Sequence, residues 1–261
     1  MSEAVRATAA DGILEVVLDR PKANAIDSAT SRALGSAFAA FRDDPALRVA
    51  IVTGGGEKFF SAGWDLKAAA EGGERPDSDY GVGGFGGLQE LPELNKPVIA
   101  ALNGMTVGGG FELALSCDLI LAAEHVRFGL PEINAGTLAD AATIKLPRRI
   151  PYHIATDLLL TGRWMDVAEA KHWGLVNEIL PADRLLPRAR EIARLLAAGP
   201  PLVFAAIKET LRRAEGLPFR AAMDLVTQKR LPTVKRLYES EDQLEGARAF
   251  AEKRKPVWKG R

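Results

Sequence analysis

The chain has 261 residues, and 47% of them are hydrophobic, which is enough for one large globular domain with a substantial core. Lys and Arg together number 34, as do Asp and Glu, so the formal net charge is zero and gives no reason to expect nucleic acid or a membrane surface as the main partner. The single cysteine, Cys117, excludes an internal disulfide and fits a reducing compartment. We expect it to pack in the core.

The N-terminal residues, MSEAVRATAADG, have neither a basic start nor an apolar centre, so they do not have the pattern of a signal peptide. No apolar run in the sequence approaches the length of a membrane span. The sequence therefore predicts a cytoplasmic protein.

The N-terminal part of the chain alternates between strand and helix patterns. Residues 13–18 predict a strand, Asp27 or Ser28 can cap a helix that stops before Pro45, and residues 49–53 predict a second strand. This alternation favours a layered α/β architecture. Residues 81–86 match the pattern G-x-G-x-x-G, but they follow a polar run and not a strand, so a dinucleotide site is not expected. We interpret residues 72–87 as a mobile loop that could form a lid or wall of a site.

The most informative stretch is 96–132. Residues 97–102 predict a buried strand, and Gly108, Gly109 and Gly110 precede a helix-forming run, which places free backbone N–H groups at a helix N-terminus, where a developing oxyanion would be stabilised. Glu112 lies in the first turn of this helix among apolar residues. Residues 118–123 and 126–128 predict two more strands, and Glu132 follows Pro131. From the residues alone, both glutamates could equally be ordinary helix N-terminal residues that the helix dipole stabilises.

The C-terminal part is predicted to be helical. Helices are expected over 144–150, 152–160, 166–173 and 183–198, with a short strand at 176–179. From residue 202 to residue 255 the pattern is helical throughout, with breaks at 216–218 and at Pro232, so we place a soft boundary near Pro200. Helices that cannot bury all their faces alone are natural oligomer contacts. His125, His153 and His172 are too far apart to have the spacing of metal ligands.

Several motifs in the same order give the sequence a resemblance to the enoyl-CoA hydratase/isomerase (crotonase) family over nearly its whole length. They are 19–25 (DRPKANA), 60–66 (FSAGWDL), the stretch 96–132, 161–163 (TGR), 170–177 (AKHWGLVN) and 250–259 (FAEKRKPVWK). Residues 41–73 are most similar to the branch of the family that interconverts carnitinyl-CoA and crotonobetainyl-CoA. The resemblance implies an α/β fold, a crotonase-like spiral of ββα units over residues 1–199, and a helical region over residues 200–261 that builds trimers or hexamers.

The resemblance also implies the site residues. The backbone N–H groups of Ala62 and Gly109 would stabilise an enolate oxygen, and Glu112 and Glu132 would be the acid and the base in the addition of water to an acyl-CoA thioester. Which glutamate has which role stays open. Coenzyme A would be part of the substrate, with no further cofactor and no metal. The residues expected to bind the substrate or its coenzyme A are Lys22, Ala23, Ala62, Gly63, Trp64, Asp65, Leu66, Gly108, Gly109, Asp140, Phe250 and Lys253.

Two features leave alternatives open. Family members commonly carry a proline near Ala139 and paired glycines near Ala142 and Thr143, and this chain has neither, although the backbone near Asp140 would help to hold the reacting water. A general enoyl-CoA hydratase, an enoyl-CoA isomerase and a non-catalytic binding protein of the same fold therefore remain as alternatives. For a trimethylammonium acyl group, Trp64 is a candidate for a cation–π contact and Phe85 a weaker one, although packing in the core or against the coenzyme A adenine is the better explanation of Trp64.

Overall fold

The centre of the fold is a six-stranded sheet with the strand order β1-β2-β4-β7-β9-β12. The computed structural model describes residues 4–261 except residues 73 and 76. β1 runs antiparallel to β2, and the other neighbours in this sheet are parallel. Every residue of β4 and β7 is buried, as expected for parallel strands that are covered on both faces. The strands are β1 (Val5–Ala10), β2 (Ile13–Leu18), β4 (Val49–Gly54), β7 (Val98–Leu102), β9 (Leu119–Ala123) and β12 (Glu178–Leu180).

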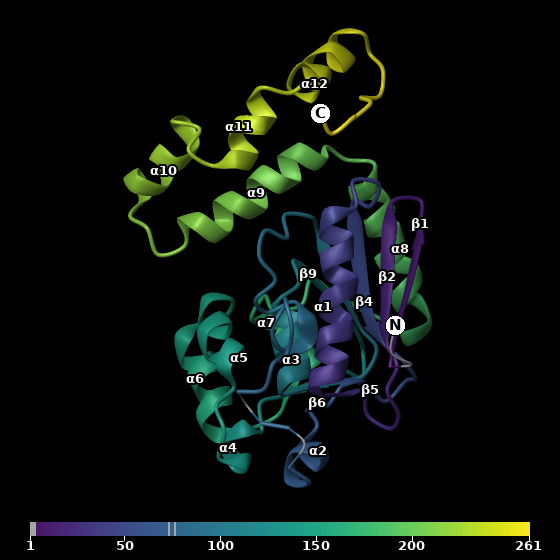
Figure 1. Ribbon diagram of the computed structural model, residues 1–261, viewed down its shortest axis with the longest axis vertical. Coiled ribbons are helices and arrows are strands. Elements are labelled where there is room, and N and C mark those ends of the chain that lie inside the picture. The colour runs from purple at the N-terminus through teal and green to yellow at the C-terminus, as the bar shows by residue number, and fades with distance from the viewer. Residues whose placement is uncertain (1–3, 73, 76) are drawn as a thin grey trace.

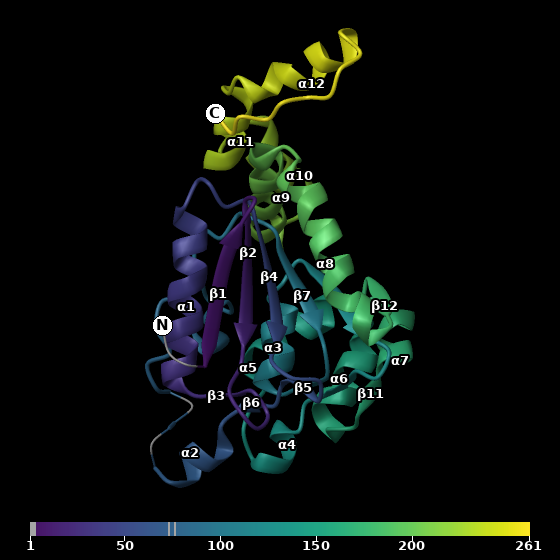
Figure 2. The same ribbon diagram turned by 90° about the vertical axis from the view of Figure 1, so that its right-hand side faces the viewer.

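Helices α1 (Ser28–Asp43) and α8 (Ala182–Ala197) lie on opposite sides of this sheet, as Figure 2 shows. The Asp27 side chain caps α1 by accepting a hydrogen bond from the Thr30 N–H at 2.7 Å. Leu34, Phe38 and Phe41 follow at helical spacing and are fully buried. The predicted start of this helix and the strands at 13–18 and 49–53 are confirmed.

Short strands follow the long ones and form a second layer. β5 (Phe59–Ser61), β8 (Met105–Val107), β10 (Arg127–Gly129) and β11 (Met165–Asp166) make a four-stranded sheet in the order β11-β10-β8-β5, and β3 (Ala25–Ile26) pairs with β6 (Gly63–Trp64). A long strand, a short strand and a helix thus recur along the chain, for example in β7, β8 and α3. This is the predicted spiral of ββα units.

Short helices surround the ends of these strands. The segment η1 (Phe85–Gly87) packs on α1, where the Ser31 hydroxyl accepts a hydrogen bond from the Gly86 N–H at 3.1 Å. The part of the predicted loop 72–87 nearest to η1 therefore lies against the core, while its residues 73 and 76 fall outside the described part of the chain. The other short helices are α2 (Leu66–Ala70), α3 (Gly109–Leu115), α4 (Glu132–Ala135), α5 (Asp140–Lys145), η2 (Leu146–Arg148), α6 (Tyr152–Thr161) and α7 (Val167–His172).

The last four helices project from one end of the core, as Figure 1 shows. They are α9 (Pro201–Ala214), α10 (Phe219–Thr227), α11 (Pro232–Tyr238) and α12 (Asp242–Ala251). Ala206 on α9, Leu231 just before α11 and Val234 on α11 form a small buried cluster apart from the main core. The predicted division into 1–199 and 200–261 stays a prediction, although this separate cluster lies on the C-terminal side of it. None of the helices among the described residues is long and apolar enough to cross a membrane.

Candidate active site

The glycines before α3 let several parts of the backbone and two side chains approach one another. A Cβ atom at Gly109 would lie 2.2 Å from Cε1 of Phe85, and one at Gly108 would lie 2.7 Å from Oε1 of Glu132. Gly108 also has a φ of 53°, which L side chains rarely adopt. Gly109 is the first residue of α3, so its N–H has no acceptor within the helix. The Gly109 N–H, which is the predicted donor, therefore lies at a helix N-terminus, and the Phe85 ring packs against Gly109.

Glu112 lies in the first turn of α3 and is 6% exposed. Its Oε1 accepts a hydrogen bond from the Ala142 N–H at 2.9 Å, and its Oε2 accepts one from Nε2 of Gln89 at 3.2 Å. Burial raises the pKa of Glu112, while these two donors act in the opposite direction. The carboxyl group is thus buried and oriented at both oxygens, and the two donors oppose part of the effect of burial.

Glu132 is the first residue of α4 and has different surroundings. Its Oε2 is buried and has no hydrogen-bond partner among the described residues. Burial raises the pKa of Glu132 to about 7, and the charges of Glu112 and Asp140 add to this effect. The Glu112 charge thus disfavours a second charge at Glu132. Near neutral pH, Glu132 is therefore the carboxyl group that more readily carries a proton.

The prediction that the Ala62 N–H is the second donor to the enolate oxygen is wrong. The Ala62 N–H donates to the Ala23 carbonyl oxygen at 2.9 Å, so it is committed to a backbone hydrogen bond. Directly after Trp64, the Asp65 N–H donates to the Ile26 oxygen at 3.0 Å. Successive N–H groups along a strand point to opposite sides, so the Trp64 N–H points away from β3. Gly63 lies so close to α3 that a Cβ there would be 2.6 Å from the Gly109 nitrogen.

The first sequence motif, 19–25, has a structural role beside the site. Asn24 is buried and donates from its amide to the Gly55 and Phe59 oxygens at 3.0 and 2.9 Å, which fixes the chain just before β6. Arg20 forms an ion pair with Asp65 at 2.7 Å. Despite partial burial, the cap hydrogen bonds of Asp65 on α2 and its Arg20 contact lower the pKa of Asp65. The motif therefore holds β6 in place.

The structure brings together most of the predicted binding residues but not all of them. Lys22 and Ala23 lie in the turn before β3, and Asp65 and Leu66 lie at the start of α2, all at the same end of the molecule as β6. Phe250 lies on α12 and Lys253 follows it, at the opposite end of the chain in Figure 1. Within one chain, these last two residues do not reach the glutamates. Their predicted contact with coenzyme A needs a neighbouring subunit and stays a prediction.

Comparisons with known proteins identify the family of this chain. The sequence profile of the enoyl-CoA hydratase/isomerase family matches residues 8–261. The chain belongs to this family. Relatives include a carnitinyl-CoA dehydratase of Salmonella arizonae, 54% identical over 261 residues, and one of Salmonella typhi, 53% identical over 262 residues, and each alignment covers 100% of both chains.

Solved structures of the enoyl-CoA hydratase/isomerase family show the same fold. An enoyl-CoA hydratase from Mycobacterium tuberculosis H37Rv has a TM-score of 0.89 at 38% identity, and covers 99% of both chains. An enoyl-CoA hydratase from Bacillus anthracis has a TM-score of 0.89 at 33% identity, over 99% of this chain and 100% of the other. The predicted crotonase-like fold is confirmed.

The segment that departs from the family pattern still forms a helix N-terminus. α5 begins at Asp140, Ala141 and Ala142 are buried, and the Ala142 N–H donates to Glu112. The substituted alanines therefore keep a backbone donor on the buried carboxylate. Whether the neighbouring N–H groups still hold a water stays a prediction.

Sequence reasoning missed two groups that contact or support Glu112. Gln89 precedes β7 in a stretch without any recognised motif, so only the tertiary contact reveals it. Lys145 on α5 donates from Nζ to the Ser116 hydroxyl at 2.7 Å, and this hydroxyl donates to the Glu112 carbonyl oxygen at 2.9 Å. Burial lowers the pKa of Lys145. In the sequence, Lys145 looks like an ordinary lysine in the last turn of a short helix, so no pattern distinguishes it.

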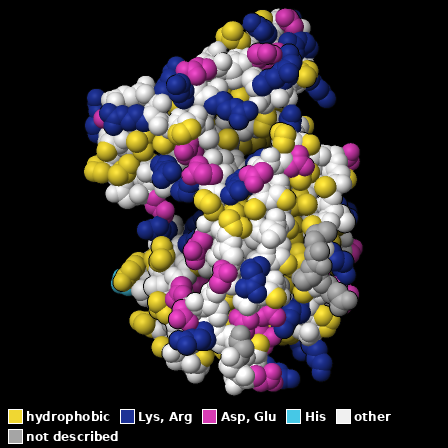
Figure 3. Space-filling model, in the orientation of Figure 1, with side chains coloured by type: hydrophobic (Ala, Val, Ile, Leu, Met, Phe, Trp, Pro, Cys, Tyr) yellow, Lys and Arg dark blue, Asp and Glu magenta, His cyan; other side chains and the backbone are white. Residues whose placement is uncertain are grey.

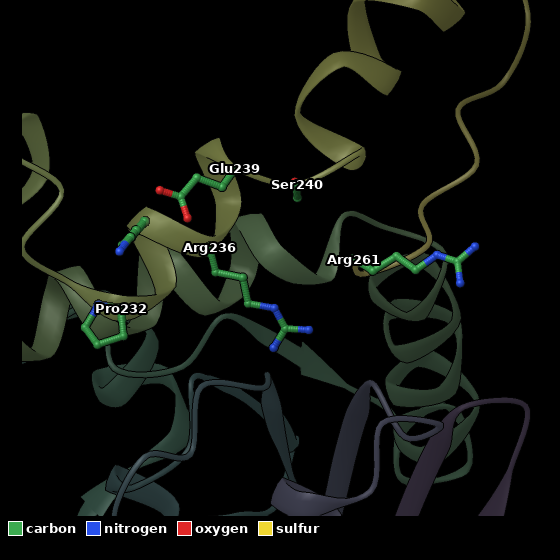
Figure 4. A pocket seen from close by; sticks show the side chains of 6 residues that line it. Pro232, Arg236, Glu239, Ser240 and Arg261 are labelled. Carbon is green, nitrogen blue, oxygen red and sulfur yellow. The ribbon is translucent and has the colours of Figure 1, made fainter.

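A hollow elsewhere in the molecule plays no part in this arrangement. It lies between α11 and the C-terminus, and Figure 4 shows the side chains that line it. None of its lining residues is a predicted site residue, and Arg236 in it donates to the Gly260 oxygen at 3.0 Å. The glutamates on α3 and α4 remain the candidate active site.

Proposed function

We propose that this protein reversibly adds water across the α,β double bond of an acyl-CoA thioester, and that its substrate pair is crotonobetainyl-CoA and carnitinyl-CoA. The observation that carries the reaction type is the pair of unequal carboxyl groups, Glu112 and Glu132, next to the N–H of Gly109. Adding water needs a base, an acid and a donor for the developing enolate, and these three groups supply them. Coenzyme A enters only as part of the substrate.

Two backbone donors stabilise the enolate oxygen in this proposal. One is the Gly109 N–H at the start of α3, and the other is the Trp64 N–H on the adjacent strand β6. The close approach of Gly63 to the Gly109 nitrogen supports the pairing, because it places β6 against the helix N-terminus. Fixed donors of this kind are typically worth on the order of 100- to 1000-fold in rate.

The surroundings of the two glutamates assign their roles. Glu112, which accepts hydrogen bonds from Ala142 and Gln89, is the ionised base that takes a proton from water while the water oxygen bonds to the β-carbon. Glu132, whose pKa burial raises to about 7, is the acid that gives its proton to the α-carbon. In the dehydration direction both proton transfers reverse.

The acyl group is proposed from the relatives. The full-length identity of 54% to a carnitinyl-CoA dehydratase supports a trimethylammonium acyl group. The fold likeness to enoyl-CoA hydratases at a TM-score of 0.89 supports general hydration of short enoyl thioesters as the second candidate. An isomerase is a weaker candidate, because both carboxyl groups of the hydration mechanism are present.

We further propose that the chain self-associates through α9 to α12, as a trimer or a pair of trimers. Phe219 on α10 and Phe250 on α12 are 82% and 87% exposed. Hydrophobic side chains gather over α10, beside a recess between the C-terminal helices and the core, as Figure 3 shows. Such exposure is costly in a monomer. Light scattering on a sizing column should give a multiple of the 28.0 kDa chain mass, and a monomer would contradict the proposal.

The function is tested by the ultraviolet absorbance of the conjugated enoyl thioester. Purified protein is given crotonobetainyl-CoA and crotonyl-CoA in parallel. Rapid loss of absorbance with the first and much slower loss with the second is expected. Preference for crotonyl-CoA would instead indicate a general hydratase, and no change with either thioester would refute hydration.

A further inference from the structure

A cluster of aromatic rings and one carboxylate lies beside the proposed oxyanion donors. We call it the aromatic–carboxylate cluster, and it consists of Trp64, Glu74, Tyr80 and Phe85. The Tyr80 and Phe85 rings meet edge to face with centroids 5.2 Å apart. The Phe85 ring also lies against Gly109, where a Cβ atom would be 2.2 Å from it. Trp64 belongs to β6, whose backbone flanks Gly109, so the cluster adjoins the proposed thioester position.

One polar atom in this cluster is buried without a partner in the described part of the chain. Oε1 of Glu74 accepts hydrogen bonds from the N–H and the hydroxyl of Ser28, at 3.1 and 2.7 Å, but its Oε2 is buried and unpaired among the described residues. The indole Nε1 of Trp64 is also buried and faces the Tyr80 side chain. An unpaired buried polar atom costs free energy, so the Glu74 oxygen beside these rings indicates a ligand site.

The negative charge of Glu74 acts on this cluster. Burial raises the pKa of Tyr80, and the Glu74 charge adds to the effect, so the carboxylate lies close enough to act on the Tyr80 ring. The other nearby carboxylates are already paired. Asp27 and Asp65 form ion pairs with Arg20 at 3.0 and 2.7 Å, and Asp77, whose charge also acts on Tyr80, forms one with Arg75 at 3.0 Å. Among these four acids, Glu74 is the one left to face a ligand cation.

We propose that the aromatic–carboxylate cluster binds the quaternary ammonium of the acyl group. A trimethylammonium cannot donate a hydrogen bond, so its recognition depends on aromatic faces and on a negative charge at van der Waals contact. The rings of Trp64, Tyr80 and Phe85 provide the faces, and Oε2 of Glu74 provides the charge. The inference rests on the proposed function, because it assigns the end of the acyl chain opposite the thioester.

The experiment compares two thioesters of the same shape. One is crotonobetainyl-CoA, and the other is 5,5-dimethylhex-2-enoyl-CoA, in which a tert-butyl group replaces the trimethylammonium. The readout is the ratio of their kcat/KM values, measured on one protein sample. This ratio does not depend on the fraction of protein that is folded. The wild-type protein should prefer the cation by about tenfold or more, as expected for desolvated cation–π and charge contacts.

The variants separate charge from shape. Glu74→Gln keeps the side-chain size and a group that accepts from Ser28, and it should lower the ratio about tenfold. Glu71→Gln is the matched control, since Glu71 is exposed and lies just after α2, and it should leave the ratio unchanged. Tyr80→Leu should lower the ratio, whereas Tyr80→Phe retains the aromatic face and should retain the ratio.

Two outcomes would overturn the inference alone. The first is equal hydration of both thioesters by the wild-type protein, and the second is an unchanged preference in Glu74→Gln. In both cases hydration itself would still be observed, so the proposed reaction would stand. Failure to hydrate either of these thioesters or crotonyl-CoA would refute the proposed function and the inference with it.

Discussion

Glu112 and Glu132 are the same residue type, but the regions around them give their carboxyl groups different hydrogen-bond partners. Glu112 is on α3, and a backbone N–H from α5 and the Gln89 amide hold both of its oxygens. Glu132 is on α4, where its Oε1 lies against Gly108 and its Oε2 has no partner among the described residues. Burial raises the pKa of both, and it raises that of Glu132 to about 7.

This difference shows how one residue type can supply both a base and an acid. Burial favours the neutral form of both carboxyl groups, and the donors aimed at Glu112 oppose this effect. The charge on Glu112 then helps to keep Glu132 protonated. The difference between the two comes from their neighbours, Gln89 after η1 and Ala142 on α5, and not from the glutamates themselves.

The largest expected effect comes from removing either titratable group. Glu112→Gln and Glu132→Gln should each lower kcat for hydration by roughly 100- to 10,000-fold, because each removes one proton transfer. Thioester binding, measured by calorimetry with a saturated acyl-CoA, should change little. Glu124→Gln, at an exposed glutamate, is the matched control. Normal turnover in either site variant would show that the site is assigned incorrectly.

The pH profile should tell the two regions apart. Glu132 must be protonated to act as the acid, so kcat/KM should fall as the pH rises through about 7. Glu112 must be ionised, so the rate should also fall at low pH. In Glu132→Gln the residual rate should lose its alkaline limb but keep its acidic limb. If the acidic limb were lost instead, Glu132 would be the base and Glu112 the acid.

A smaller effect should come from moving Glu132 without removing it. Gly108→Ala places a Cβ atom 2.7 Å from Oε1 of Glu132, and a displacement of about 1 Å in a reacting group can cost about 100-fold in rate. Gly216→Ala is the matched control, because Gly216 has a φ of +80° and no atom within 4 Å of its Cβ position. The two variants carry similar backbone strain. Equal kcat values would show that the Glu132 contact is unimportant.

The smallest expected effect on rate comes from the Gln89 contact. Gln89→Leu removes a donor to the charged form of Glu112, so the pKa of Glu112 should rise and the acidic limb of the pH profile should move to higher pH. We expect a loss of about tenfold in kcat at neutral pH. Gln243→Leu, at an exposed position on α12, serves as the control. A lower rate with an unmoved acidic limb would indicate a packing defect and not a positioning role.

The sequence predicted much of the framework because its elements carry local signals. The cap at Asp27, the buried apolar run of β7 and the glycines before α3 each follow from nearby residues, and each was confirmed. β1 was missed because its sequence, VRATAA, has no alternating apolar pattern, and it forms only by pairing with β2. The short second-layer strands are two or three residues long, which is below the length that a pattern can show.

Within the site, the sequence placed Glu112, Glu132 and Gly109 but misplaced the second backbone donor. The motif at 60–66 shows that a backbone turn lies near the site, whereas the direction of each N–H depends on pairing with β3. That pairing occupies the Ala62 N–H and leaves the Trp64 N–H on the other side. A sequence motif does not contain this information, because the partner strand is far away along the chain.

The sequence by itself therefore determined the family, the ββα framework and the two carboxyl groups, since these depend on local patterns and on residue identity. Only the tertiary structure decided that Gln89 and Ala142 donate to Glu112, that Oε2 of Glu132 is buried without a partner among the described residues, and that Glu74 lies close to Tyr80. These properties depend on burial and on contacts between segments up to about 50 residues apart, such as Glu74 and Ser28. Electrostatic interactions depend on distance in space, and the fold alone sets that distance.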